Sequence, residues 1–116
     1  MQSGISEQAF RAEVLDSSTP VLVHFWAPWC GICRLIEPSL NQLLKEWGEQ
    51  LKLVSINADE NLKLACGYRI TTLPTVLLFH GGQVLHRLDS YQKREEFRTI
   101  LEETLSMRVG AAARRL

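Results

Sequence analysis

Short apolar runs alternate along the chain with longer segments in which apolar residues recur about every fourth position. "PVLVHFW" (20–26) is rich in valine and aromatic residues and predicts a buried strand, and "LKLVSIN" (51–57) alternates as a second strand. Between them, residues 31–48 carry an apolar stripe near the helical period, with Pro38 inside it and Gly48 at its end. A strand, a helix and a strand with short connections form a βαβ unit, so the two strands should run parallel.

The second half of the chain predicts a hairpin. "TVLLFH" (75–80) and "QVLHRLD" (83–89) flank a "GG" pair, which is a turn signal between strands. Three further helices are predicted from periodicity and capping residues: 6–17 with Ser6 as N-cap, a short one from an N-cap at Asp59 to about Gly67, and 93–106. The pattern therefore indicates one α/β domain, with a short extra strand near Ile5 as a further element.

Length and composition narrow the class of protein. The 116 residues suit one domain, which we place at 1–106, followed by a short basic tail at 107–116. Thirteen basic and thirteen acidic residues cancel, so nothing indicates a nucleic-acid or anionic-lipid partner. No apolar stretch approaches the ~20 residues that a membrane helix needs, and the first ten residues do not resemble a secretory signal.

The chain has three cysteines, an odd and low number that argues against a secreted disulfide framework. We therefore expect a reducing compartment and a cytoplasmic protein. Cys66 lies at the end of the predicted short helix, beside Gly67, and we expect it to be a small buried apolar residue rather than a regulatory thiol.

The segment "HFWAPWCGICR" (24–34) carries Cys30 and Cys33 where a strand meets a helix. Free backbone N–H groups and the dipole at a helix N-terminus favour negative charge, so the pKa of the Cys30 thiol should be lowered. Cys33 lies one turn further on, close enough to form a ring with Cys30. This arrangement predicts that Cys30 attacks a disulfide of a target and that Cys33 then displaces the reduced target.

Two other interpretations of the cysteine pair compete with redox chemistry. A zinc site would need Cys66 and a histidine to complete the ligand set, and a core cysteine pair would be chemically inert. The position at a helix start favours redox chemistry over both. Because the two thiols themselves carry the electrons, we expect neither a metal nor a bound cofactor.

At this point the sequence resembles the thioredoxin family. "FWAPWCGIC" is similar to the family's active-site segment, "TLPT" (72–75) to its cis-proline loop and "FHGGQV" to its hairpin, and Pro38 matches its helix-kinking proline. The resemblance spans about residues 5–106. It implies a thioredoxin fold, with a central mixed sheet of four to five strands flanked by helices. It also implies dithiol–disulfide exchange with Cys30 as nucleophile and Cys33 as resolving thiol.

The resemblance further implies a substrate-docking surface. It is made of Trp29, Gly31, Ile32, Leu73 and Pro74, the last with a cis peptide bond. From the residues alone a trans proline is the default, since only ~5–6% of X–Pro bonds are cis. The alternative is that Trp29 is a core residue, because tryptophan is usually well buried.

Several positions depart from the family pattern. His24 stands where most members carry a buried aspartate, Ser55 where a lysine is common, Ile32 where a proline separates the cysteines, and Ser90 where a glycine lets partners approach. Leu22, His24 and Trp26 share one face of their strand, so burial should lower the pKa of His24. Our hypothesis is that neutral His24 accepts the proton of Cys33; the alternative is a satisfied core histidine.

The resemblance implies a protein that reduces disulfides in target proteins. Its electron donor would be a thioredoxin reductase that uses NADPH or ferredoxin, and we expect a monomer. Two alternatives stay open. One is a disulfide isomerase or oxidant that uses the same cysteines, and the other is an interaction module with weak turnover.

Overall fold

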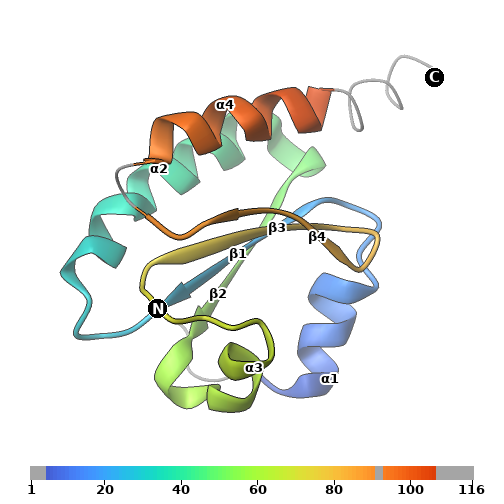
Figure 1. The fold of residues 1–116 in the computed structure, drawn as a ribbon. Coiled ribbons are helices and arrows are strands. Elements are labelled where there is room, and N and C mark those ends of the chain that lie inside the picture. Colours follow the sequence, from blue (N-terminus) through green and yellow to red (C-terminus); the bar gives the residue numbers. More distant parts are fainter. Residues whose placement is uncertain (1–4, 91–92, 107–116) are drawn as a thin grey trace.

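Four strands form one mixed sheet in the computed structural model of the chain, which describes residues 5–90 and 93–106 (Figure 1). β1 (Val21–Trp26) runs parallel to β2 (Lys52–Asn57) on one side and antiparallel to β3 (Thr75–His80) on the other. β4 (Gln83–Leu88) pairs antiparallel with β3 and completes the order β2-β1-β3-β4. The predicted parallel pair, hairpin and α/β class are confirmed. Ile5 itself lies outside any strand, and the residues before it, where the suggested extra strand would also fall, lie outside the described residues.

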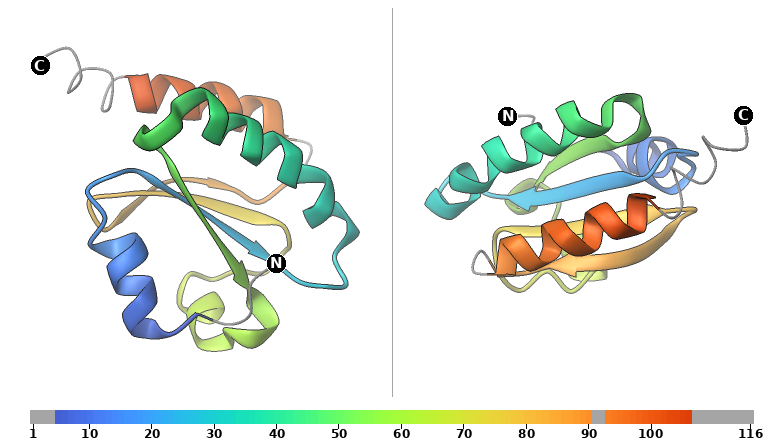
Figure 2. Two further views of the ribbon diagram at one scale, coloured as in Figure 1. Left: turned by 180° about the vertical axis from the view of Figure 1, so that it is seen from behind. Right: turned by 90° about the horizontal axis from the view of Figure 1, so that it is seen from above.

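Helices cover both faces of this sheet (Figures 1 and 2). The two long helices, α2 (Gly31–Trp47) and α4 (Arg94–Leu105), lie on one face. The other face carries α1 (Glu7–Phe10), which continues as the π-helical turn η1 (Arg11–Leu15), and α3 (Leu62–Gly67). The central strand β1 is buried along its whole length because it has helices on both sides.

The alternation of side chains along β1 divides the core into two parts. Val21, Val23 and Phe25 face α1 and α3, where the rings of Phe10, Tyr68 and Phe79 meet with centroids 5.4–5.9 Å apart. Leu22 faces α2 and α4 and packs in a second cluster, whose members include Ile36, Leu40, Leu43, Val76, Leu78, Phe97 and Leu101. Side chains from all parts of the chain thus hold β1 and the start of α2 in place.

Capping residues mark the helix boundaries. Ser6 is the N-cap of α1 as predicted, and its hydroxyl accepts the Ala9 N–H at 3.0 Å. Gly48 ends α2 with a φ of 57° and begins the short 3₁₀ turn η2 (Gly48–Gln50).

The predicted start of the short helix is wrong. Asp59 lies inside the 3₁₀ turn η3 (Ala58–Glu60), and the residue before α3 is Asn61. The side chain of Asn57 accepts the Asp59 N–H at 2.9 Å, so the capping role falls two residues earlier than the sequence suggested. Asp59 is thereby left free to interact elsewhere.

Within residues 5–90 and 93–106, no helix has both the length and the apolar character needed to cross a membrane. The predicted basic tail at 107–116 lies outside the described residues.

Candidate active site

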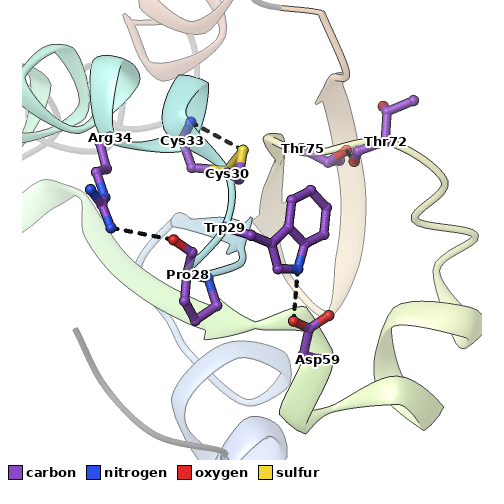
Figure 3. The surroundings of a disulfide bond; sticks show 8 residues. All are labelled: Pro28, Trp29, Cys30, Cys33, Arg34, Asp59, Thr72 and Thr75. Atoms are coloured by element: carbon purple, nitrogen blue, oxygen red, sulfur yellow. Dashed lines mark hydrogen bonds between the residues drawn. A yellow bond between two sulfur atoms is a disulfide. The ribbon is translucent and has the colours of Figure 1, made fainter.

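The cysteine pair stands where β1 leads into α2. Cys30 is the N-cap of α2, with extended backbone, and its Sγ accepts the N–H of Cys33 at 3.2 Å. The two residues are joined as a disulfide, with their Cα atoms 5.4 Å apart (Figure 3). Because a helix start offers both a free N–H and a favourable dipole, this position suits a sulfur that becomes an anion when the bond is reduced.

The two sulfurs differ in exposure. Cys30 is 6% exposed, whereas Cys33 is 1% exposed and lies against the sheet side of the helix. Trp26 and Ala27 pack against the pair from the end of β1, and half-buried Leu73 packs there too. Cys30 is therefore the more accessible of the two cysteines.

The loop that contains Leu73 is held beside the disulfide by hydrogen bonds. The Leu73–Pro74 peptide bond is cis and Pro74 is buried, as the family resemblance implied. The Thr75 hydroxyl donates to the Thr72 carbonyl at 2.7 Å, and the Thr72 hydroxyl donates to the carbonyl of Asp89 at 3.3 Å (Figure 3 shows the two threonines). These bonds tie the loop to the ends of β3 and β4.

Arg87 anchors the first part of the same loop. Its guanidinium donates to the carbonyls of Tyr68 and Arg69 at 2.8 and 2.7 Å. Arg69 has a φ of 54°, an unusual conformation for a non-glycine residue, and the two bonds help to hold it. Sequence analysis did not find Arg87, since its partners lie 18 or more positions away.

Trp29 is exposed. Its side chain is 70% accessible, and its indole N–H donates to Oδ2 of Asp59 at 2.9 Å (Figure 3). The alternative that placed Trp29 in the core is therefore wrong. Ile32 is 46% exposed and Gly31 is exposed as well, so both lie at the surface beside the disulfide. Asp59, which η3 presents, is a residue of this surface that sequence reasoning missed.

His24 is 1% exposed, on the face of β1 that meets α2. Burial lowers its pKa to about 4, so the ring is neutral at neutral pH, as predicted. Neither ring nitrogen has a hydrogen-bond partner within the protein, and whether the ring accepts a proton from Cys33 or is only a core histidine stays a prediction. Ser55 is its register partner on β2, and both residues line a cleft of about 170 Å³.

Cys66 is exposed, so the expectation of a small buried residue is wrong; its neighbour Ala65 takes the buried position. In the described part of the chain, no three histidine, cysteine or acidic side chains are grouped to hold a metal ion. The zinc alternative thus has no ligand set there.

A disulfide at the start of a helix, with a cis-proline loop packed beside it on a mixed sheet, defines the class of thiol–disulfide oxidoreductases. A family model described as "Thioredoxin" matches residues 2–103 of the chain. The chain therefore belongs to the thioredoxin family.

Curated relatives agree with this assignment. "Thioredoxin 1" of Nostoc sp. is 44% identical over 79 residues, which cover 68% of this chain and 74% of the relative. The thioredoxin of Synechocystis sp. has the same identity and the same coverage. The chloroplastic "Thioredoxin M-type" of Chlamydomonas reinhardtii is also 44% identical over 79 residues, which cover 68% of this chain and 56% of that protein. The protein is accordingly a thioredoxin-type disulfide oxidoreductase.

Proposed function

We propose that this thioredoxin reduces disulfide bonds in other proteins, with Cys30 as the nucleophile and Cys33 as the resolving thiol. The thiolate of Cys30 attacks one sulfur of the target disulfide, and the other target sulfur leaves. Cys33 then loses its proton and attacks Cys30, so the second target sulfur leaves and the Cys30–Cys33 disulfide forms. Two electrons pass from the dithiol to the target, and no bound cofactor takes part.

One observation carries this assignment of roles. The Sγ of Cys30, and not that of Cys33, occupies the N-cap of α2, where it accepts the Cys33 N–H at 3.2 Å. An N–H donor and the helix dipole both favour the anionic form of that sulfur. The greater exposure of Cys30 supports the same order of events, because the first sulfur must meet a partner and the second needs to meet only Cys30.

We infer that targets dock on the surface around Cys30. Trp29, Gly31 and Ile32 supply exposed and largely apolar contacts beside the disulfide, and Leu73 and Pro74 border it from the cis-proline loop. The bond from the Trp29 indole to Asp59 limits the motion of the ring. A preformed apolar surface of this kind suits an extended segment of a target on either side of its cysteine.

We also propose that His24 accepts the proton of Cys33, a transfer that costs free energy. Moving a proton from a thiol of ordinary pKa, about 8.5, to an imidazole whose pKa is about 4 costs about 6 kcal/mol. Such a transfer can only be transient, and the proton must then leave a residue that is 1% exposed. Rates of target reduction against pH for His24→Ala and His24→Asp test the idea; profiles identical to that of the wild type would remove it.

For the electron donor we propose a thioredoxin reductase that uses NADPH or ferredoxin, and for the location the cytoplasm, with the protein as a monomer. Support for this comes from relatives that are cyanobacterial thioredoxins. Ser90 is half-buried at the end of β4, where its side chain would face a docked partner. We therefore expect slower reduction by a standard reductase than for a Ser90→Gly variant.

Reduction of insulin disulfides tests the proposed function. With dithiothreitol as electron donor, we expect the protein to reduce insulin and the Cys30→Ser variant not to do so. When the NADPH-dependent and the ferredoxin-dependent reductase are each supplied in turn, we expect at least one of them to support insulin reduction. Slow turnover of the wild type with dithiothreitol would instead support an interaction module. Fast insulin reduction with dithiothreitol but none with either reductase would refute the proposed electron donor. It would leave the proposed reduction of target disulfides by Cys30 and Cys33 in place.

A further inference from the structure

Among the described residues, four buried side-chain atoms have no hydrogen-bond partner in the protein. They are Nδ1 and Nε2 of His24, Nε1 of Trp26 and Oε1 of Glu37. Leaving a buried polar atom unpaired costs about 1–3 kcal/mol, so such atoms are normally paired with protein groups or with water. All four belong to residues of β1 and α2 that line clefts on one side of the sheet, one of which also contains Cys33, and this points to a polar function there rather than to scattered packing faults.

These residues line two neighbouring clefts. The first, of about 390 Å³, is lined by Trp26, Ala27, Pro28, Cys33, Arg34 and Glu37. The second, of about 170 Å³, is lined by His24, Glu37, Leu40, Asn41, Leu53 and Ser55. Glu37 is the residue that the two linings share. Each cleft has room for water, whose share of the liquid volume is about 30 Å³ per molecule.

The helical period explains why one residue reaches both clefts. Cys33, Glu37 and Asn41 follow one another at four-residue intervals on α2, so their side chains lie in one row along the helix. Cys33 opens on the first cleft, Asn41 on the second, and Glu37 lies between them. Glu37 is half-buried: it has one oxygen enclosed in the protein, while part of the side chain remains accessible to solvent.

We propose that Glu37 is a proton-relay residue of the exchange reaction, which carries the proton released by Cys33 to solvent. The proposal rests on the role of Cys33 as the resolving thiol. Carboxylates accept and donate protons readily, and a group at the boundary between a buried thiol and water is well placed for that transfer.

In the mixed disulfide, the proton of Cys33 Sγ–H moves to the Glu37 carboxylate, directly or through one water. The Cys33 thiolate attacks Cys30 Sγ; the bond between the two cysteines forms, and the bond from Cys30 to the target breaks. The electron pair of the broken bond leaves on the target sulfur, which takes a proton from solvent. Glu37 then releases its own proton to solvent.

The other titratable or charged side chains that line the two clefts are few. α2 supplies Cys33 and Arg34, β1 supplies His24, and β2 supplies only Leu53 and Ser55, which do not titrate. The Arg34 guanidinium donates to the Pro28 carbonyl at 3.3 Å. His24 is neutral at neutral pH and nearly inaccessible, so a proton that it held would also leave by way of the cleft that Glu37 lines.

The test isolates the step in which Cys33 attacks Cys30. Exposed Cys66 is first replaced by serine, so that it does not react. The reduced protein is then mixed in a stopped-flow instrument with one equivalent of dithionitrobenzoate, whose coloured thiolate is released once when Cys30 attacks and once when Cys33 resolves. The two phases are recorded against pH for Glu37→Gln, Glu37→Asp and the control Glu49→Gln, an exposed glutamate in η2, the turn after α2.

We expect Glu37→Gln to slow the second phase at least about tenfold at neutral pH and to change its pH profile. The first phase should be unchanged, which also shows that the site is folded. Glu37→Asp should keep most of the rate, and Glu49→Gln all of it. Formate should partly restore the second phase of Glu37→Ala, because the cleft beside Cys33 can admit a small carboxylate.

A second phase of Glu37→Gln with wild-type rate and pH profile would overturn the relay. A faster one would overturn it too, because it would mean that Glu37 only disfavours the Cys33 thiolate by its charge. Failure of the relay can be distinguished from failure of the proposed function. If the proposed function were wrong, the wild-type protein itself would not reduce insulin, whatever residue stood at position 37.

Discussion

Acid should destabilise this protein through His24. The residue is 1% exposed, and burial lowers its pKa from an ordinary 6.5 to about 4. Above pH 6.5 the ring is neutral in both the folded and the unfolded chain, so its contribution to the free energy of unfolding does not depend on pH. As the pH falls below 6.5, the His24 ring becomes protonated in the unfolded chain, whereas in the folded chain it stays neutral until about pH 4.

The size of the effect follows from the two pKa values. In that window the free energy of unfolding falls by about 1.4 kcal/mol for each pH unit, because the unfolded state binds one more proton. From pH 6.5 to pH 4 the total is about 3 kcal/mol, a large share of the about 5–15 kcal/mol that stabilises a typical domain. The folded state therefore loses stability toward low pH and keeps it at neutral pH.

Urea unfolding of the oxidised protein between pH 7.5 and pH 4 measures this loss. Carboxylates also titrate in this range, so the quantity to compare is the difference between the wild type and His24→Leu. Leucine has no polar atom to bury, and Leu40 and Leu53 line the same cleft. His24→Leu should be the more stable protein at neutral pH, by about 1–3 kcal/mol, and its advantage should widen by about 3 kcal/mol on acidification.

A matched control for the histidine-to-leucine change is His80→Leu, at a half-buried position at the end of β3, and the result for His24→Leu is compared with it. If the difference between wild type and His24→Leu stayed constant from pH 7.5 to pH 4, burial of an unpaired neutral imidazole would be the wrong description of this site.

Three further predictions address the surface and the core. Asp59→Ala releases the Trp29 indole, so KM for a protein target should rise while the redox potential stays unchanged. Insulin reduction measures the KM and titration in glutathione buffers measures the potential; a shifted potential would speak against a docking role. Ile32→Pro removes a backbone N–H at the start of α2 and should lower the redox potential, since the Cys30 thiolate loses a nearby donor; a more oxidising variant would contradict this. Leu101→Ala, at a fully buried position of α4, should cost about 2–5 kcal/mol in urea unfolding, and a loss below about 1 kcal/mol would mean that α4 packs loosely.

Local signals in the sequence predicted much of this architecture. The βαβ unit and the hairpin could be predicted because alternation, helical period and turn residues act over a few positions. The position of Cys30 at a helix start followed from the same patterns, since the apolar run of β1 ends just before it. The burial of His24 followed from the alternation along that strand.

Features that depend on distant segments could not be predicted in this way. The bond from Trp29 to Asp59 joins positions 30 apart and forms only because η3 and the loop after β1 meet at the same end of the sheet. The exposure of Cys66 was missed because α3 has six residues, too few turns for periodicity to identify its buried face. Glu37 belongs to no motif in the sequence, and only the packing of α2 on β1 and β2 encloses one of its oxygens.

Trapping of the mixed disulfide tests the central claim most directly, namely that the sulfur at the start of α2 attacks the target. The Cys33→Ser variant is reduced, incubated with insulin and analysed by peptide mass spectrometry. We predict a stable adduct in which an insulin cysteine is joined to Cys30. Adducts carried by the exposed thiol of Cys66 instead, with Cys30 unmodified, would contradict the account.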